Sequence, residues 1–295
     1  MSTLWQNIQY KMLQSGNKIS LLIGINVVVF LVVNLTAVIE QLFFSGFGNS
    51  LILNLSAEYL HMPASLPKLA TRFWTPITYM FMHAGIFHIL FNMLWLYWMG
   101  QIFEEYLGDK RTIGLYIAGG LAGALLFLLF YNLVPAFTQV NAAANSTIVG
   151  ASASVMAVIV ATATLLPNYT IPLILIGPVK LKWLVLFYVV IDFLGIAGSN
   201  AGGEIAHLGG ALLGFVYIKQ LQRGNDWIGS VSKMFKRSKP AMKVVSHNQP
   251  QKRSSGQPRQ EEVDRILDKI SGSGYDSLSK QEKDTLFRAS NNNES

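Results

Sequence analysis

The sequence contains no cysteine and few charged residues. The absence of cysteine excludes disulfide bonds, thiolate metal sites and a cysteine nucleophile. Only 13% of the 295 residues are charged, against about 25% in ordinary soluble proteins. In contrast, 51% are hydrophobic, and the mean hydropathy is +0.37. A water-soluble globular protein is therefore excluded, and we expect an integral membrane protein.

The net charge of +7 is concentrated in the last quarter of the chain. From Lys219 onward there are 15 basic and 9 acidic residues, whereas the preceding part carries 8 basic and 7 acidic ones. A basic segment beside a membrane is typical of contact with anionic lipid on the cytoplasmic side. We therefore expect the lipid bilayer, and no nucleic acid, as a partner of this segment.

Six apolar stretches are predicted to cross the bilayer as helices. Their approximate ranges are 19–39, 76 or 83 to 103, 112–134, 148–166, 181–197 and 204–221. The first stretch is too long for a signal peptide and lacks a small-residue cleavage site. The fold class predicted is an all-α polytopic membrane protein with a six-transmembrane-helix bundle.

The basic residues of the links between the spans predict the orientation. Six spans place both termini on one side, and the positive-inside rule identifies that side as cytoplasmic. We expect a multi-pass protein of the plasma (inner) membrane. In this orientation the fourth and sixth spans start at the outer face, and the second span descends from it.

Composition divides the chain into four parts. We expect a cytoplasmic N-terminal segment (1–18), the membrane domain (19–223), a basic disordered linker (224–260) and a short helical module (261–295). In the last part, apolar residues at helical spacing predict one helix, and a capping box at Ser279 to Glu282 predicts a second.

Four polar residues of the spans are predicted to share one layer. At 1.5 Å per residue, Ser152 would lie roughly 6 to 8 Å below the outer start of its helix, and His207 a similar step below the start of its own. His88 and Asn92 lie on one face of the second span, also in its outer half. Because polar groups inside a membrane are costly, they are candidates for function.

These residue types are suited to nucleophilic catalysis. His207 could take the proton of Ser152 and return it to a leaving amine. The first-turn amide of Ser152 and the side chains of His88 and Asn92 could stabilise an oxyanion. We expect no cofactor and no metal, and the absence of a His-Glu-x-x-His sequence removes the common zinc-peptidase signature.

Small residues support close packing of the fourth and sixth spans. They repeat at every fourth position, which allows two helix backbones to touch. The two series are Ala153, Ala157 and Ala161, and Ala206, Gly210 and Gly214. Gly150 would similarly leave room beside the serine.

Structural interpretations stand beside the catalytic one. Ser152 could be a packing residue, and His88 and Asn92 could join helices or bind an ion. Asp192 could support the base or be solvated at a helix end, and Glu204 could support the base or act as an N-terminal helix charge. Ser154 is a rival nucleophile, but it lies on another helix face.

Three motifs resemble those of the rhomboid intramembrane serine proteases, over about residues 19–221. The first is Gly150-Ala151-Ser152-Ala153, similar to the family's G-x-S-G nucleophile motif. The second is His83-Ala-Gly-Ile-Phe-His88-Ile-Leu-Phe-Asn92. The third is Ala206-His207-Leu-Gly-Gly210-x-x-x-Gly214. The resemblance implies that Ser152 is the nucleophile, His207 the base, and His88 and Asn92 the oxyanion donors.

The sequence also departs from the family pattern. Trp74, nine residues before His83, corresponds to the start of the family's Trp-Arg pair, but Thr75 replaces the arginine. Ala153 replaces the glycine after the serine, and Met156 replaces a frequent aromatic residue. We regard Trp74, His83 and Gly150 as supporting residues of the site.

The sequence thus predicts an intramembrane serine endopeptidase. Its substrates would be transmembrane proteins cleaved in or near their membrane segments, and the resemblance implies a substrate helix that partly unwinds, with a small side chain before the scissile bond. The alternative is a catalytically silent rhomboid-like protein that binds or escorts client membrane proteins.

Overall fold

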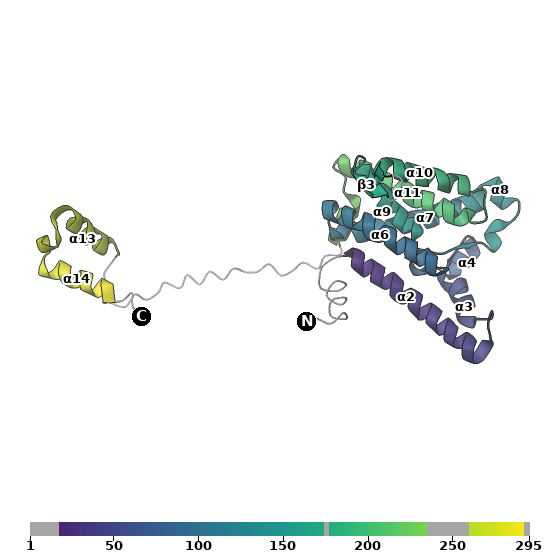
Figure 1. Cartoon of the computed structure of the whole chain (residues 1–295), viewed down its shortest axis with the longest axis horizontal. Helices are drawn as coiled ribbons and strands as arrows, with labels where there is room; N and C mark the ends of the chain where they lie inside the picture. Colours follow the sequence, from purple (N-terminus) through teal and green to yellow (C-terminus); the bar gives the residue numbers. More distant parts are fainter. Residues whose placement is uncertain (1–17, 174–176, 235–259, 292–295) are drawn as a thin grey trace. The chain divides into compact units, whose positions relative to one another are not determined.

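The computed structural model describes residues 18–173, 177–234 and 260–291 (Figure 1). The chain divides into two compact units, Met1–Arg237 and Ser238–Ser295. Within the described ranges most elements are helices. The predicted N-terminal segment, apart from its last residue, and the predicted linker beyond residue 234 lie outside the described residues.

Four helices of the first unit are long and apolar enough to cross a membrane, so the chain is a multi-pass membrane protein. They are α2 (Lys18–Glu40), α6 (Ile86–Leu107), α7 (Asp109–Leu133) and α11 (Ala201–Gln222). Two shorter helices, α9 (Ser152–Leu165) and α10 (Leu181–Gly195), stand where the fourth and fifth spans are predicted. The predicted fourth helix is therefore too long at its N-terminal end.

Helix α9 lies at the centre of the first unit, packed against α6, α7, α10 and α11 (Figure 1). Eleven of its 14 residues are buried. Small residues allow α11 to approach it: a Cβ at Gly210 would collide with the carbonyl oxygen of Ala153, and one at Gly214 with that of Ala157. The α9–α11 contact thus has no room for larger side chains at these two positions.

The connection between α2 and α6 contains several short elements. In chain order they are a π-helical turn (Gln41–Ser45), α3 (Leu51–Leu60), β1 (Met62–Pro63), α4 (Leu66–Thr71), α5 (Thr75–Thr78) and the 3-10 helix η3 (Tyr79–Phe81). Strand β1 pairs antiparallel with β2 (Thr147–Ile148), with Met62 opposite Ile148. This pairing holds the segment that leads into α9.

Two elements join α7 to this segment. They are α8 (Pro135–Thr138) and the 3-10 helix η4 (Ala142–Ala144). Asn132, near the end of α7, donates a hydrogen bond of 2.9 Å from Nδ2 to the carbonyl oxygen of Ala64. The link before α9 is therefore attached to the connection between α2 and α6 at more than one point.

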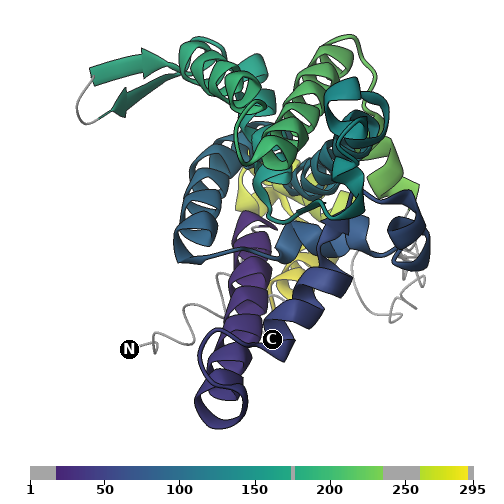
Figure 2. The ribbon, with the colours of Figure 1, turned by 90° about the vertical axis from the view of Figure 1, so that its right-hand side faces the viewer.

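A β-hairpin that the sequence analysis missed joins α9 to α10. Strand β3 (Thr170–Leu173) pairs with β4 (Gly177–Lys180), with Ile171 opposite Val179. The hairpin projects away from the helices of its unit (Figure 2). Each strand contains a proline, Pro172 or Pro178, and proline is unfavourable in strands, so the sequence gives little strand signal here.

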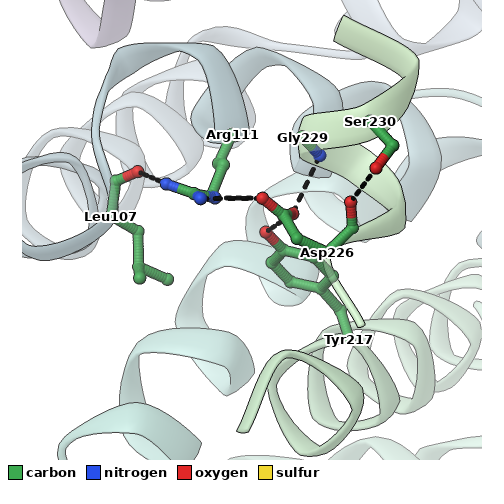
Figure 3. Close-up of polar contacts among 6 residues, drawn as sticks. All are labelled: Leu107, Arg111, Tyr217, Asp226, Gly229 and Ser230. Carbon is green, nitrogen blue, oxygen red and sulfur yellow. Dashed lines mark hydrogen bonds and ion pairs between the residues drawn. The ribbon is translucent and has the colours of Figure 1, made fainter. Parts of the chain in front are cut away.

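Helix α12 (Trp227–Met234) follows α11 and lies in the stretch predicted to be a linker. Figure 3 shows how it is anchored: Arg111 donates to Oδ2 of Asp226 from Nε at 2.9 Å and from Nη2 at 2.7 Å, and the Tyr217 hydroxyl donates to Oδ1 at 3.2 Å. The buried Ile228 packs against Gly114 of α7. The linker was predicted from the composition of residues 224–260 as a whole, which is mostly polar, so the short helix at its start was missed.

The second unit is a pair of helices, α13 (Gln260–Ser273) and α14 (Lys280–Asn291), joined by the 3-10 helix η5 (Tyr275–Ser277). The predicted capping box is confirmed: the backbone N–H of Ser279 donates to Oε2 of Glu282 at 2.8 Å, and that of Glu282 donates to Oγ of Ser279 at 3.3 Å. Ile266 and Leu278 are its buried apolar residues.

Candidate active site

A cavity of about 470 Å³ lies among α6, α9, α10 and α11. Its lining includes all four residues that the sequence predicts to share one layer: His88, Asn92, Ser152 and His207. The remaining lining is mostly apolar and aromatic. Three helices that are far apart in the sequence therefore bring their polar residues to one largely apolar cavity.

Ser152 is the first residue of α9, whereas the prediction placed it about one turn inside the helix. The predicted depth of Ser152 below its own helix start is therefore wrong. His207 is the seventh residue of α11, so α9 begins nearly two turns deeper along the bundle than α11 does. As a first-turn residue, Ser152 has a backbone N–H without an intrahelical partner, which suits it to bind an oxyanion.

Gly150 shapes the chain just before the serine. Its φ of 129° lies in a region that side-chain-bearing residues rarely adopt. Its N–H donates to the carbonyl oxygen of Tyr79 at 3.0 Å, and the Tyr79 hydroxyl donates to the carbonyl oxygen of Gly120 at 2.6 Å. The turn that presents Ser152 is thus tied to η3 and, through Tyr79, to α7.

His88 is oriented by its own N-terminal turn. Its Nδ1 accepts a hydrogen bond of 3.4 Å from the backbone N–H of Ala84. A neutral imidazole that accepts at Nδ1 carries its proton at Nε2. A Cβ built on Gly150 would lie 2.8 Å from this Nε2 and 3.5 Å from Oγ of Ser152, so the donor nitrogen and the candidate nucleophile both lie next to Gly150.

Asn92 is one turn further along α6. Its Nδ2 donates to the carbonyl oxygen of His88 at 2.8 Å, which fixes the amide in the cavity wall. An amide nitrogen carries two hydrogens. The second hydrogen is available to a group inside the cavity, as an oxyanion donor requires.

The predicted supporting residues occupy different places. His83 is buried but does not line the cavity; its ring packs edge-on against His88, with centroids 5.2 Å apart. Trp74 lies away from the site and donates from Nε1 to the carbonyl oxygen of Tyr59 at 2.8 Å. His83 therefore packs against His88 from outside the cavity, whereas Trp74 joins two parts of the connection between α2 and α6.

Arg72 is an anchor that the sequence analysis missed. It forms an ion pair with Glu58, donates from Nη1 to the Glu58 carbonyl oxygen at 2.7 Å and lies over the Tyr59 ring. The sequence showed only that Thr75 replaces the arginine of the family's pair. The sequence does contain an arginine near Trp74, but it lies two residues before the tryptophan instead of directly after it. This nearby arginine was the signal from which the anchor could have been predicted.

Ser154 is excluded as the nucleophile by its surroundings. It is 1% exposed, does not line the cavity, and its Oγ has no hydrogen-bond partner among the described residues. A Cβ at Gly120 would lie 2.6 Å from this oxygen. Ser154 therefore faces α7, and Ser152 is the hydroxyl that the cavity presents.

Two carboxyl groups lie beside Nδ1 of His207. Its Nδ1 lies 3.3 Å from Oδ1 of Asp192 and 3.5 Å from Oε2 of Glu204. One ligand atom from each of the three residues lies within 4.8 Å of the others. Such a group could support a histidine base or hold a divalent cation with nitrogen and oxygen ligands.

Comparison with known proteins identifies the family of the chain. Residues 70–223, more than half of the chain, match the family model described as Rhomboid domain, and residues 253–292 match a family of unknown function, DUF6576. The chain is 31% identical over 161 residues to RHOMBOID-like protein 12, mitochondrial, of Arabidopsis thaliana, which covers 52% of this chain and 48% of that protein.

Two further relatives match shorter shares of their own length. RHOMBOID-like protein 1 of Arabidopsis thaliana is 33% identical over 156 residues, 51% of this chain and 36% of that protein. Rhomboid protease GlpG of Salmonella choleraesuis (strain SC-B67) is 36% identical over 55 residues, 19% of this chain and 20% of that protein. The chain thus spans about half or less of the length of these curated relatives. By its family model, this chain belongs to the rhomboid family.

Proposed function

We propose that the protein is an intramembrane serine endopeptidase that hydrolyses peptide bonds in or near the transmembrane segments of other membrane proteins. One observation carries the proposal: Ser152, His207, His88 and Asn92 line a single cavity. The rhomboid family includes intramembrane serine proteases, which adds support from similarity. The substrates would be transmembrane proteins, and no cofactor enters the chemistry.

The proposal includes a membrane arrangement. Helices α2, α6, α7, α9, α10 and α11 would form six spans, with both termini in the cytoplasm and the protein in the plasma (inner) membrane. The short α9 would not reach the outer surface by itself, since its 14 residues extend only about 21 Å. Its recessed start would leave the cavity open toward the outer face, where water could enter.

The first half of the reaction would form an acyl-enzyme. Nε2 of His207 takes the proton of the Ser152 hydroxyl as Oγ attacks the substrate carbonyl carbon. The negative oxygen then accepts hydrogen bonds from the Ser152 N–H, Nε2–H of His88 and Nδ2–H of Asn92. Collapse of this intermediate breaks the C–N bond, and the imidazolium of His207 gives its proton to the leaving amine.

Water completes the cycle. His207 takes a proton from a water molecule that attacks the ester carbon, and the same donors stabilise the second oxyanion. Return of the proton to Oγ releases the second product and restores Ser152. The apolar surroundings strengthen each of these hydrogen bonds, since the local dielectric constant is low.

The cavity wall favours apolar substrates. Phe87, Phe91 and Trp95 contribute aromatic groups from α6, and Tyr188 faces them from α10, with the rings of Trp95 and Tyr188 6.3 Å apart. Met156 of α9 also lines the cavity. A flexible thioether in place of an aromatic ring adapts to different side chains, so Met156 would influence which residue is accepted before the scissile bond.

One observation favours the alternative, a catalytically silent protein that binds client membrane proteins. Within the described ranges, no hydrogen bond joins Oγ of Ser152 to His207. Such bonds are often long without substrate and tighten in the reactive complex. We therefore place catalysis first and binding alone second.

Cleavage of a model transmembrane substrate in proteoliposomes tests the proposal. We expect the wild-type protein to cleave it, and Ser152→Ala and His207→Ala each to lower the rate by about three orders of magnitude or more. Ser154→Ala, a neighbouring serine outside the cavity, is the matched control and should retain activity. Folded wild-type protein that binds the substrate without cleaving it would support the alternative instead.

A further inference from the structure

The two carboxyl groups beside His207 have no part in a serine–histidine pair. We infer that Asp192 is a positioning residue for His207, with Glu204 as a second acceptor, so that the base is held by carboxylates on the side away from the nucleophile. This inference rests on the proposed function, because it assigns a role in the same reaction.

The first argument is the place of Asp192. It is the twelfth residue of the 15-residue helix α10, it is only 4% exposed, and its Oδ2 has no hydrogen-bond partner among the described residues. Burying a carboxyl group within apolar helices is costly unless a partner compensates. The imidazole of His207 is the group that its Oδ1 approaches, at 3.3 Å. Solvation at a helix end, the alternative interpretation, does not fit so buried a residue.

The second argument is the space made for Glu204. A Cβ at Gly195 of α10 would lie 3.0 Å from Cγ of Glu204, so the glycine lets this side chain run between α10 and α11. Glu204 lies one turn before His207 on the same helix, and Asn200 donates to its Oε1 at 3.3 Å. Glu204 is therefore the secondary acceptor for two reasons: Asn200 competes for its carboxylate, and its distance to His207, 3.5 Å, is the longer one.

The third argument is chemical. A carboxylate that accepts from Nδ1–H holds the imidazole in the tautomer whose Nε2 is free to take a proton. When the Ser152 proton moves to Nε2, the ring becomes positive and the carboxylate stabilises that charge, while the Nδ1 proton stays on the ring. Among the described residues, the other titratable groups at this place are His88 from α6, which faces His207, and Tyr188 from α10, which faces the two carboxyl groups. Neither of these carries a negative charge at neutral pH, so the carboxylates are the groups that can balance the imidazolium.

Amide variants test the inference in the full-length protein. We expect Asp192→Asn to lower kcat by about 100-fold to 10,000-fold with KM changed less than threefold, Glu204→Gln to lower kcat by less, and the double variant to lower it most. The acid limb of the kcat profile should move to lower pH in Asp192→Asn. Asp192→Glu, which keeps the carboxylate, should recover part of the rate. Glu105→Gln, an acid-to-amide change at an exposed position of α6, is the control.

A second measurement does not depend on activity. In the Ser152→Ala background, ¹⁵N NMR of His207 should show the Nδ1–H tautomer, and Asp192→Asn should convert it to a mixture. The NMR spectrum of His207 also tests the inference if an amide variant is too unstable for activity measurements. Wild-type protein that cleaves nothing would remove the proposed function, while the NMR result would still decide whether the carboxylates fix the tautomer.

Three outcomes would overturn the inference while leaving the proposed function intact. One is active wild-type protein in which both amide variants and the double variant retain kcat within twofold and an unchanged pH profile. Another is an unaltered His207 tautomer in Asp192→Asn. The third is loss of wild-type activity on chelation with recovery on adding Zn²⁺, which would assign the three residues to a metal site.

Discussion

A Cβ atom on Gly150 would lie 2.7 Å from Cε1 and 2.8 Å from Nε2 of His88. Atoms of real side chains do not approach this closely, so the imidazole occupies space that any other residue at position 150 would fill. The same Cβ would also lie 3.5 Å from Oγ of Ser152. The absence of a side chain at Gly150 therefore leaves room for His88 next to the turn that presents Ser152.

Replacing this glycine should damage the site more than the fold. We expect Gly150→Ala to lower the cleavage rate by at least about tenfold, because the new methyl group displaces His88 and the φ of 129° is unfavourable for alanine. Gly85→Ala is the matched control, since a Cβ there meets no atom within 4 Å. Equal rates for the two variants would show that the close approach has no functional role.

The oxyanion donors should affect kcat rather than substrate binding. We expect His88→Ala and Asn92→Ala each to reduce kcat by about 100-fold to 1,000-fold, the usual cost of one lost donor, with KM altered far less. His61→Ala, outside the cavity, should leave kcat unchanged. An effect confined to KM would mean that the two side chains bind substrate instead of stabilising the transition state.

The contact between α9 and α11 should be sensitive to a single methyl group. Gly210→Ala places its Cβ against the backbone of Ala153, so we expect a loss of stability of about 1 to 3 kcal/mol, measured by thermal unfolding in detergent. Leu212→Ala changes an exposed residue on the same helix and should have little effect. Comparable losses in both variants would argue against a specific contact at Gly210.

The attachment of α12 should depend on pH. Partial burial opposes ionisation of Asp226, but hydrogen bonds from Arg111 and the Gly229 N–H outweigh it and hold the pKa of Asp226 below its ordinary value. A depressed pKa in the folded state gives stability that is present above the ordinary carboxyl pKa of about 4 and is lost as the pH falls through the folded value. Asp226→Asn should therefore lower stability by about 1 to 2 kcal/mol at neutral pH.

The difference between wild type and Asp226→Asn should shrink below about pH 4, as thermal unfolding at several pH values would show. Glu105→Gln, at an exposed position, should show no such trend. A difference that stays constant down to pH 2 would contradict the ionic attachment. The same attachment predicts that truncation after Gly224 destabilises the protein, because it removes Asp226 and Ile228.

Much of the site could be inferred from the sequence because polar side chains stand out in apolar spans. Intramembrane polar residues are few, so Ser152, His207, His88 and Asn92 could be grouped from the sequence, although the depth predicted for Ser152 from helix rise was wrong. The start of the fourth helix was wrong, since the apolar residues before Ser152 form β2 and a glycine turn instead of helix. Hydropathy reports how long an apolar stretch is, but it does not tell whether that stretch forms a helix, a strand or a turn.

Other features depend on contacts that spacing does not reveal. Asp192 lies 15 residues before His207, and only the crossing of α10 and α11 brings its carboxyl group to Nδ1. Arg72 reaches Glu58 across a bend between α3 and α4. The hydrogen bonds of Arg111 with Asp226 join positions 115 residues apart. Such pairings follow from helix packing and require the tertiary structure.

The central claim is that Ser152 is an activated nucleophile. The direct measurement is labelling of the folded, membrane-reconstituted protein by a serine-directed fluorophosphonate, with the adduct located by peptide mass spectrometry. We predict that wild type and Ser154→Ala are labelled at Ser152, and that Ser152→Ala is not labelled. Folded wild-type protein that remains unlabelled, or Ser152→Ala labelled as strongly as wild type, would contradict the account.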